Sequence, residues 1–115
     1  MSPADFRRLA LEMDGACEDR HMGHPDFRVS GKIFATLGYP DEHFAVVLLT
    51  PDEQAAFVRA APRLFTPVKG GWGRRGSTQI ALAAVDARTL RKAVRTAWQR
   101  RAPKKSSVST RPADT

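Results

Sequence analysis

The sequence of 115 residues predicts an α+β protein of two layers, in which helices pack on a single, largely antiparallel sheet. Three observations predict this class. Apolar residues recur at helical spacing near both ends of the chain, they alternate along residues 27–37, and a strong helix start follows at residue 50. Because short turns join the strand-like segments, neighbouring strands should be antiparallel. The predicted order is a helix, three or four strands, a helix, two strands and a helix.

Each predicted helix begins with a capping residue. Ser2-Pro3-Ala4-Asp5 starts the first, which should end at about residue 14. Thr50-Pro51-Asp52-Glu53 combines a Thr cap, a Pro at the first position and a Glu three residues after the cap, so we expect a helix to about Ala61. Asp86 caps the last helix, whose apolar stripe is Leu90, Ala93, Val94, Ala97 and Trp98.

Residues 27–29 and 33–37 predict two half-buried strands that are joined by a tight turn. A two-residue turn would place Val29 opposite Lys32, whereas a three-residue turn would pair Val29 with Ile33 and keep one face apolar. We favour the second, because a slip of one residue moves every side chain to the other face.

Three further strands are predicted along the chain. The unbroken apolar run 43–49 is typical of a central strand that is at least partly covered on both faces. Residues 64–68 and 77–84 predict two shorter strands. Together with the hairpin of residues 27–37, these segments supply the strands of the predicted sheet.

Charge is distributed unevenly along the chain, although the net charge is +7. Residues 1–54 carry five basic and ten acidic side chains, and residues 55–115 carry fourteen basic and two acidic ones. This polarity suggests an anionic partner, of which nucleic acid is the usual one, and a merely solubilising role for the charge explains it equally well. We expect one domain over residues 1–102 and a disordered basic tail over residues 103–115.

Composition also predicts the compartment. No apolar run approaches the ~18 residues that cross a bilayer, so we expect no membrane partner. The N-terminus has no basic stretch leading into an apolar segment, and Cys17 is the single cysteine. We therefore predict a cytoplasmic protein.

Two histidines and a carboxylate lie close together in the sequence, at His21, His24 and Asp26. Cys17 precedes them, and His43 is the one further histidine that could join them as a ligand. Their spacing matches no standard pattern of metal ligands. A polar loop between strands explains them better, and a lone cysteine is usually a small core residue. We expect neither a metal nor a cofactor, and no catalytic residues.

The loop from Lys69 to Gly76 combines four glycines with three cations and Trp72. Glycines allow a close approach of the backbone to a ligand, and the side chains suit phosphates and bases. Alternatively, the glycines supply positive φ in a hairpin, and Trp72 covers the edge of the core. We favour the ligand interpretation for Arg74 and Arg75, and the structural one for Trp72.

The outer face of the last helix carries a row of cations with almost no carboxylates at i,i+4 to pair with them. Such a face can bind phosphates, although a solvated helix face is usually charged and late cations also favour the helix dipole. The candidate nucleic-acid-binding residues are Lys69, Trp72, Arg74, Arg75, Arg88, Arg91, Lys92 and Arg95.

The segments His24-Pro25-Asp26-Phe27-Arg28-Val29 and Gly31-Lys32-Ile33-Phe34-Ala35 resemble the MmcQ/YjbR family of small bacterial proteins. The resemblance covers about residues 4–102 and includes Gly71-Trp72-Gly73 and Ala97-Trp98, whereas Ser77 stands where many relatives have a second Trp. It implies a fold similar to frataxin and secretion chaperones. Family members are commonly labelled DNA-binding, and no agreed catalytic residues or cofactor come with the resemblance.

These observations lead to a functional expectation with an alternative. We expect a non-enzymatic protein that binds nucleic acid, chiefly DNA, through phosphate contacts with little sequence specificity. The alternative is a protein-interaction or chaperone-like adaptor that uses the sheet face, with Phe34 and its neighbours exposed. An enzyme would require the histidines and Asp26 to converge in a concave pocket.

Overall fold

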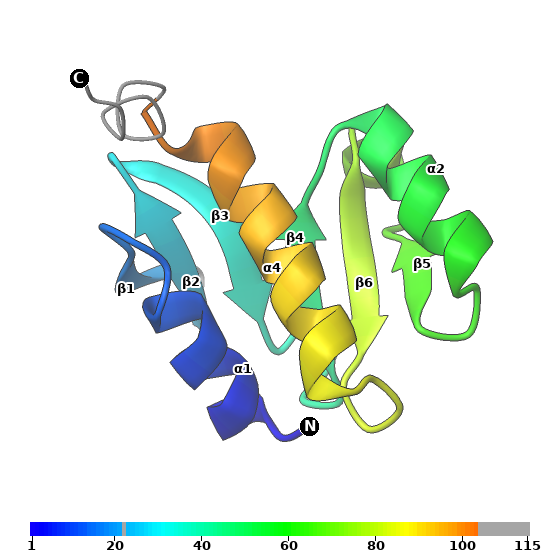
Figure 1. The fold of residues 1–115 in the computed structure, drawn as a ribbon, viewed down its shortest axis with the longest axis horizontal. Coiled ribbons are helices and arrows are strands. Elements are labelled where there is room, and N and C mark those ends of the chain that lie inside the picture. The colour runs from blue at the N-terminus through cyan, green and yellow to red at the C-terminus, as the bar shows by residue number, and fades with distance from the viewer. Residues whose placement is uncertain (22, 104–115) are drawn as a thin grey trace.

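The computed structural model describes residues 1–21 and 23–103 and shows one sheet with its long helices against one face (Figure 1). The elements are α1 (Pro3–Leu11), β1 (Cys17–His21), β2 (His24–Val29), β3 (Lys32–Leu37), β4 (Phe44–Leu48), α2 (Pro51–Ala60), β5 (Phe65–Pro67), α3 (Gly71–Arg74), β6 (Ser77–Ala81) and α4 (Ala87–Arg101). The strand order is β1-β2-β3-β4-β6-β5, and every neighbouring pair is antiparallel. The predicted α+β class is confirmed.

The element order differs from the predicted one by the short helix α3, which lies between β5 and β6. The predicted tail lies, from residue 104 onward, outside the described residues. Within the described part of the chain, no helix has the length and apolar character that crossing a membrane requires.

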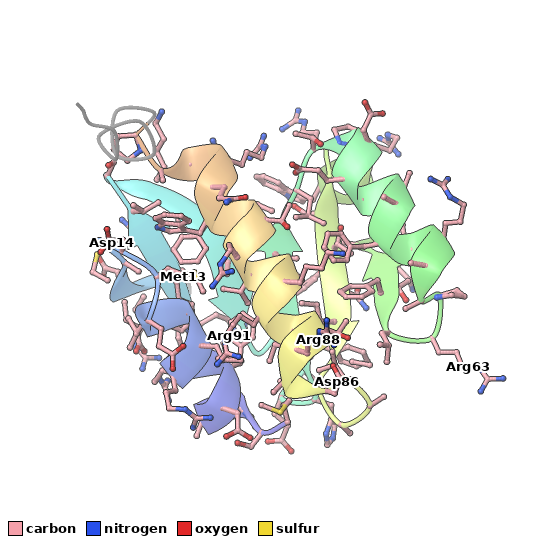
Figure 2. The ribbon with its side chains drawn as sticks, in the orientation of Figure 1. Met13, Asp14, Arg63, Asp86, Arg88 and Arg91 are labelled. Atoms are coloured by element: carbon pink, nitrogen blue, oxygen red, sulfur yellow. The ribbon has the colours of Figure 1, made fainter. Side chains whose placement is uncertain are left out.

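The three long helices start at the predicted caps. The Ser2 hydroxyl accepts a hydrogen bond from the backbone N–H of Asp5 at 3.1 Å, and the Thr50 hydroxyl accepts one from Glu53 at the same distance. Asp86, at the first turn of α4 in Figure 2, accepts a bond of 2.8 Å from the backbone N–H of Thr89. That hydrogen bond holds the pKa of Asp86 below its ordinary value, because it stabilises the ionised carboxylate.

The register that we favoured for the β2–β3 hairpin is wrong at its turn. Val29 pairs with Lys32, so the loop has two residues, and both Ser30 and Gly31 have positive φ, at 53° and 77°. A bulge follows, after which Phe27 pairs with Ala35. The strands therefore return to the register that a three-residue turn would give, and the bulge turns both Phe34 and Ala35 into the core.

The core lies between the helices and one face of the sheet. The α4 stripe is buried over β3 and β4, and Phe6 of α1 meets Phe27 edge-on with ring centroids 5.8 Å apart. Phe34 is also fully buried, so the expectation that it is exposed is wrong. The face of the sheet without the long helices α1, α2 and α4 carries Ile33 and Thr36 of β3 and Val46 and Leu48 of β4, and it is called the open face below.

The glycines of residues 70–76 approach the protein's own backbone. A Cβ atom on Gly73 would lie 1.7 Å from the carbonyl oxygen of Val68, and one on Gly76 would lie 1.8 Å from that of Leu49. The predicted close approach therefore exists, but it seats α3 against the neighbouring strands rather than admitting a ligand.

We predict that Gly73→Ala lowers the free energy of unfolding by about 2 kcal/mol or more, because the added methyl group must displace the Val68 backbone. Urea denaturation measures the effect. Gly71→Ala is the matched control in the same helix, since the nearest atom to its Cβ is the end of the flexible Arg74 side chain at 3.7 Å. Equal stability of the two variants would contradict the prediction.

Candidate nucleic-acid interface

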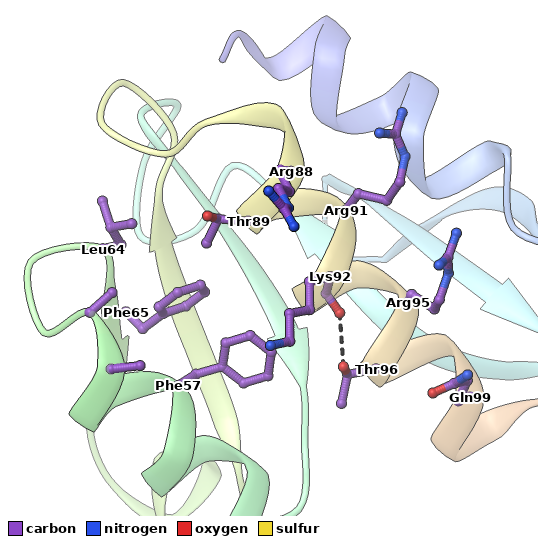
Figure 3. Close-up of a pocket in the computed structure, with 12 residues that line it drawn as sticks. Phe57, Leu64, Phe65, Arg88, Thr89, Arg91, Lys92, Arg95, Thr96 and Gln99 are labelled. Atoms are coloured by element: carbon purple, nitrogen blue, oxygen red, sulfur yellow. Dashed lines mark hydrogen bonds between the residues drawn. The ribbon is translucent and has the colours of Figure 1, made fainter.

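Four of the predicted cations meet along one groove between α2 and α4. Its volume is about 690 Å³. Phe57, Leu64 and Phe65 provide its apolar side, which Figure 3 shows facing the polar side chains of α4. The α4 side is formed by Arg88, Thr89, Arg91, Lys92, Arg95, Thr96 and Gln99. This depression is called the α2–α4 groove below.

The groove follows from where the two helices pack. The apolar stripe of α4 is buried over β3 and β4, whereas α2 packs against β5 at the edge of the sheet. The surface above β6 is therefore left between them, and the polar side of α4 borders it. Lys92 extends from α4 toward Phe57 of α2, and Arg88 lies one turn earlier in the helix (Figure 3).

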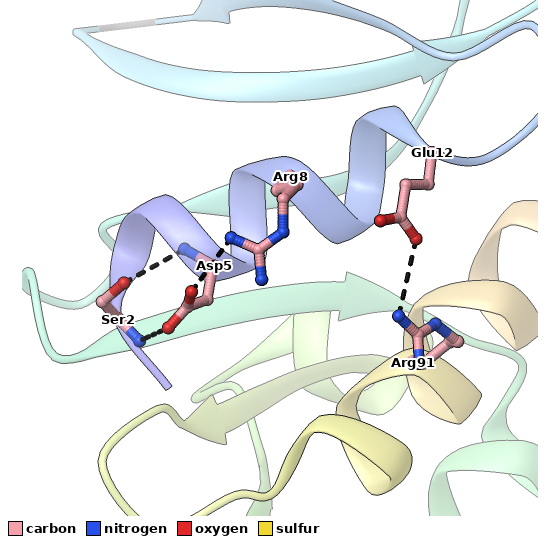
Figure 4. Close-up of polar contacts among 5 residues, drawn as sticks. All are labelled: Ser2, Asp5, Arg8, Glu12 and Arg91. Atoms are coloured by element: carbon pink, nitrogen blue, oxygen red, sulfur yellow. Dashed lines mark hydrogen bonds and ion pairs between the residues drawn. The ribbon is translucent and has the colours of Figure 1, made fainter.

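The cations of the α2–α4 groove are not equivalent. Arg91 forms an ion pair at 3.6 Å with Glu12, an acidic residue just beyond α1 (Figure 4). Arg88, Lys92 and Arg95 form no ion pair with any residue of the ranges 1–21 and 23–103. The positive potential of the groove therefore comes mainly from these three residues.

The other predicted residues gather around α3, away from the α2–α4 groove. Lys69, Arg74 and Arg75 are exposed, and the guanidinium of Arg75 lies 5.7 Å from the centre of the Trp72 ring, within cation–π distance. Trp72 itself is 66% exposed, so the expectation that it covers the core edge is wrong. The predicted residues thus form two clusters rather than one contiguous surface.

Trp72 lies at a second groove, on the open face of the sheet. Its volume is about 500 Å³, and its lining is mostly apolar. Tyr39, which is 44% exposed, joins Trp72 in this lining. The remaining lining residues are His24, Ile33, Thr36, Val46, Leu48, Val68 and Ser77. This depression is called the open-face groove below.

Tyr39 is the residue that sequence reasoning missed. The segment from Gly38 to Asp41 is typical of a turn, and a turn gives no reason to assign a role to its aromatic residue. The sequence contained one signal of its exposure: a large aromatic side chain in a short polar turn has little apolar surface nearby against which to be buried.

The carboxylate of the histidine cluster, Asp26, is bonded to an arginine. Asp26 is buried and accepts two hydrogen bonds from the Arg28 guanidinium, at 2.8 and 3.1 Å, and these bonds raise the pKa of Arg28 above its ordinary value. Across the residues that the structure describes, no three His, Cys, Asp or Glu side chains gather as metal ligands. Cys17 is exposed, contrary to the expectation of a core residue.

The fold and these two grooves define a small α+β protein with one antiparallel sheet, long helices on a single face and cations on the outer side of its last helix. The family model of YjbR matches residues 11–100, which is most of the chain, and the protein belongs to this family, the MmcQ/YjbR family. Comparisons with curated proteins and with solved structures give no match.

Proposed function

We propose that the protein binds nucleic acid without catalysing a reaction, and that it holds the phosphates of DNA chiefly through the α2–α4 groove. The observation that carries the proposal is the row of Arg88, Lys92 and Arg95, which share one side of α4 and form no ion pair within the part of the chain that the structure describes. Cations without local partners attract an external anion. Sequence specificity is not required, because phosphate contacts carry none.

The spacing of the three cations suits a nucleic-acid backbone. Residues 88 and 95 are seven positions apart, so their Cα atoms are separated by about 10 Å along the helix axis. Three steps along one DNA strand, from one phosphate to the fourth, also rise about 10 Å. The long side chains of Arg88, Lys92 and Arg95 can therefore reach neighbouring phosphates from one helix.

A second candidate function is a protein-interaction adaptor that uses the open face. The observation in its favour is the apolar floor of the open-face groove, which includes Ile33, Val46 and Leu48. Phe34 takes no part, because it is buried on the helix side. Binding through this floor would persist at high salt, whereas binding to phosphates would weaken steeply.

We predict that replacing Arg88, Lys92 and Arg95 together by Ala weakens duplex DNA binding and lowers the slope of log affinity against log salt by about 2 to 3, because each phosphate contact releases counterions. A salt series beginning at ~50 mM, followed by fluorescence anisotropy of labelled duplex, measures it. The matched control replaces Lys32, Arg59 and Arg63, which are exposed but lie outside this groove.

The control should bind like the parent protein. The absence of duplex binding by the parent at ~50 mM salt would refute the proposal, since phosphate contacts are strongest there. Comparing the full chain with one that ends at Pro103 separates the charges of Lys104, Lys105 and Arg111 from those of α4.

We further predict that Glu12→Gln strengthens duplex binding several-fold at low salt, because it releases Arg91 from its ion pair (Figure 4). The same anisotropy titration measures this effect. In the Arg91→Ala protein, the Glu12→Gln substitution should have a clearly smaller effect. An equal gain in both backgrounds would show that Glu12 acts through the overall charge rather than through Arg91.

A further inference from the structure

We infer that the open-face groove binds unpaired nucleobases, which stack against Trp72 and Tyr39. The proposal builds on the proposed function in assuming a nucleic-acid ligand, but it concerns the opposite face of the sheet and a different chemistry. It assigns the protein a preference for single strands, which phosphate contacts alone do not give.

The aromatic side chains of this groove are unusually exposed for their size. Trp72 is 66% exposed and Tyr39 is 44% exposed, and both line the same groove. Among the described residues, the other large apolar side chain of comparable exposure is Leu11, at 39%, which does not line this groove. Two flat rings at one depression form a stacking platform, and such platforms are typical of proteins that bind single strands.

The position of Trp72 is fixed before any ligand arrives. The side-chain amide of Gln54 in α2 donates to the carbonyl oxygen of Gly73 at 2.9 Å and to that of Ser77 at 3.1 Å. Gly73 is also seated directly on the backbone of Val68. The short helix that presents Trp72 is therefore held from two sides. The backbone that carries the indole loses little conformational freedom on binding.

The floor of the groove is mostly apolar. The bulge in β3 directs Ile33 and Thr36 to the open face, next to Val46 and Leu48 of the adjacent strand β4. Ser77 of β6, where a large residue would fill the space, contributes a small side chain beside Trp72. The volume of about 500 Å³ is within the usual range of ligand sites.

Charge at α3 selects a nucleic acid over an apolar protein segment. Arg75 lies against the Trp72 ring, and Arg74 is exposed in the same short helix. Neither forms an ion pair within residues 1–21 and 23–103. An apolar peptide would leave these cations without a counterpart, whereas a strand that places its bases on the rings brings phosphates next to them. Base pairs inside a duplex cannot stack in this way.

The test compares binding of the full chain to two labelled probes. One is a single-stranded oligodeoxythymidine of ten nucleotides, and the other is a duplex of the same length. We expect Trp72→Ala to weaken single-strand binding about tenfold and to change duplex binding by less than about twofold. Trp72→Phe should restore most of the affinity, because a phenyl ring still stacks. Leu11→Ala is the matched control for removing an exposed apolar side chain, and it should bind both probes like the parent.

A spectroscopic measurement locates the contact. Trp98, the other tryptophan, donates from Nε1 to the carbonyl oxygen of Asp14 at 2.8 Å and is only partly exposed. Quenching of tryptophan emission by oligodeoxythymidine should therefore occur in the parent and disappear in Trp72→Phe.

Unchanged single-strand affinity in Trp72→Ala, or emission that oligodeoxythymidine does not quench, would overturn this inference. The second result would favour an apolar protein segment as the ligand of the open-face groove. Neither result bears on duplex binding through α4. Conversely, quenching and Trp72-dependent binding without duplex binding would support the inference and refute the proposed function, so the two failures are distinguishable.

Discussion

The burial of α4 across the middle of the sheet is the constraint on which both surfaces depend. Leu90, Ala93, Val94 and Ala97 have almost no exposed area and pack over β3 and β4. Because the helix has a 3.6-residue period, fixing that stripe inward directs Arg88, Lys92 and Arg95 outward. The same packing places all the long helices on one face (Figure 1), which leaves the other face of the sheet to its own side chains and to α3.

Much of the fold could be predicted because its signals are local. Capping at Ser2, Thr50 and Asp86 depends on residues within one turn, and the structure confirms all three caps. The β2–β3 turn could not be predicted, because the bulge is a property of two strands together. Alternation within residues 33–37 contains no sign that Phe34 and Ala35 share a side, and so it misplaced Phe34.

Neither groove could be predicted from the sequence, which identified only the α4 cations and Trp72 among their lining residues. The helical period indicated that the α4 cations share one side, and the structure brings them to the same groove. The ion pair that neutralises Arg91 could not be predicted, because Glu12 and Arg91 are far apart in the sequence and meet through the packing of α1 beside α4. Tyr39 and Trp72 likewise meet at one groove only because β3, β4 and β6 are neighbours in the sheet.

The separation of the two surfaces by the sheet has an energetic consequence. In the proposed binding mode, salt weakens the attraction between the α4 cations and phosphates, whereas stacking on Trp72 depends on contact area and changes little with salt. Among the described residues none lines both grooves, so substitutions in one should combine additively with substitutions in the other. Affinity for the nucleic-acid backbone and preference for unpaired bases can then vary independently while the core that supports both remains unchanged.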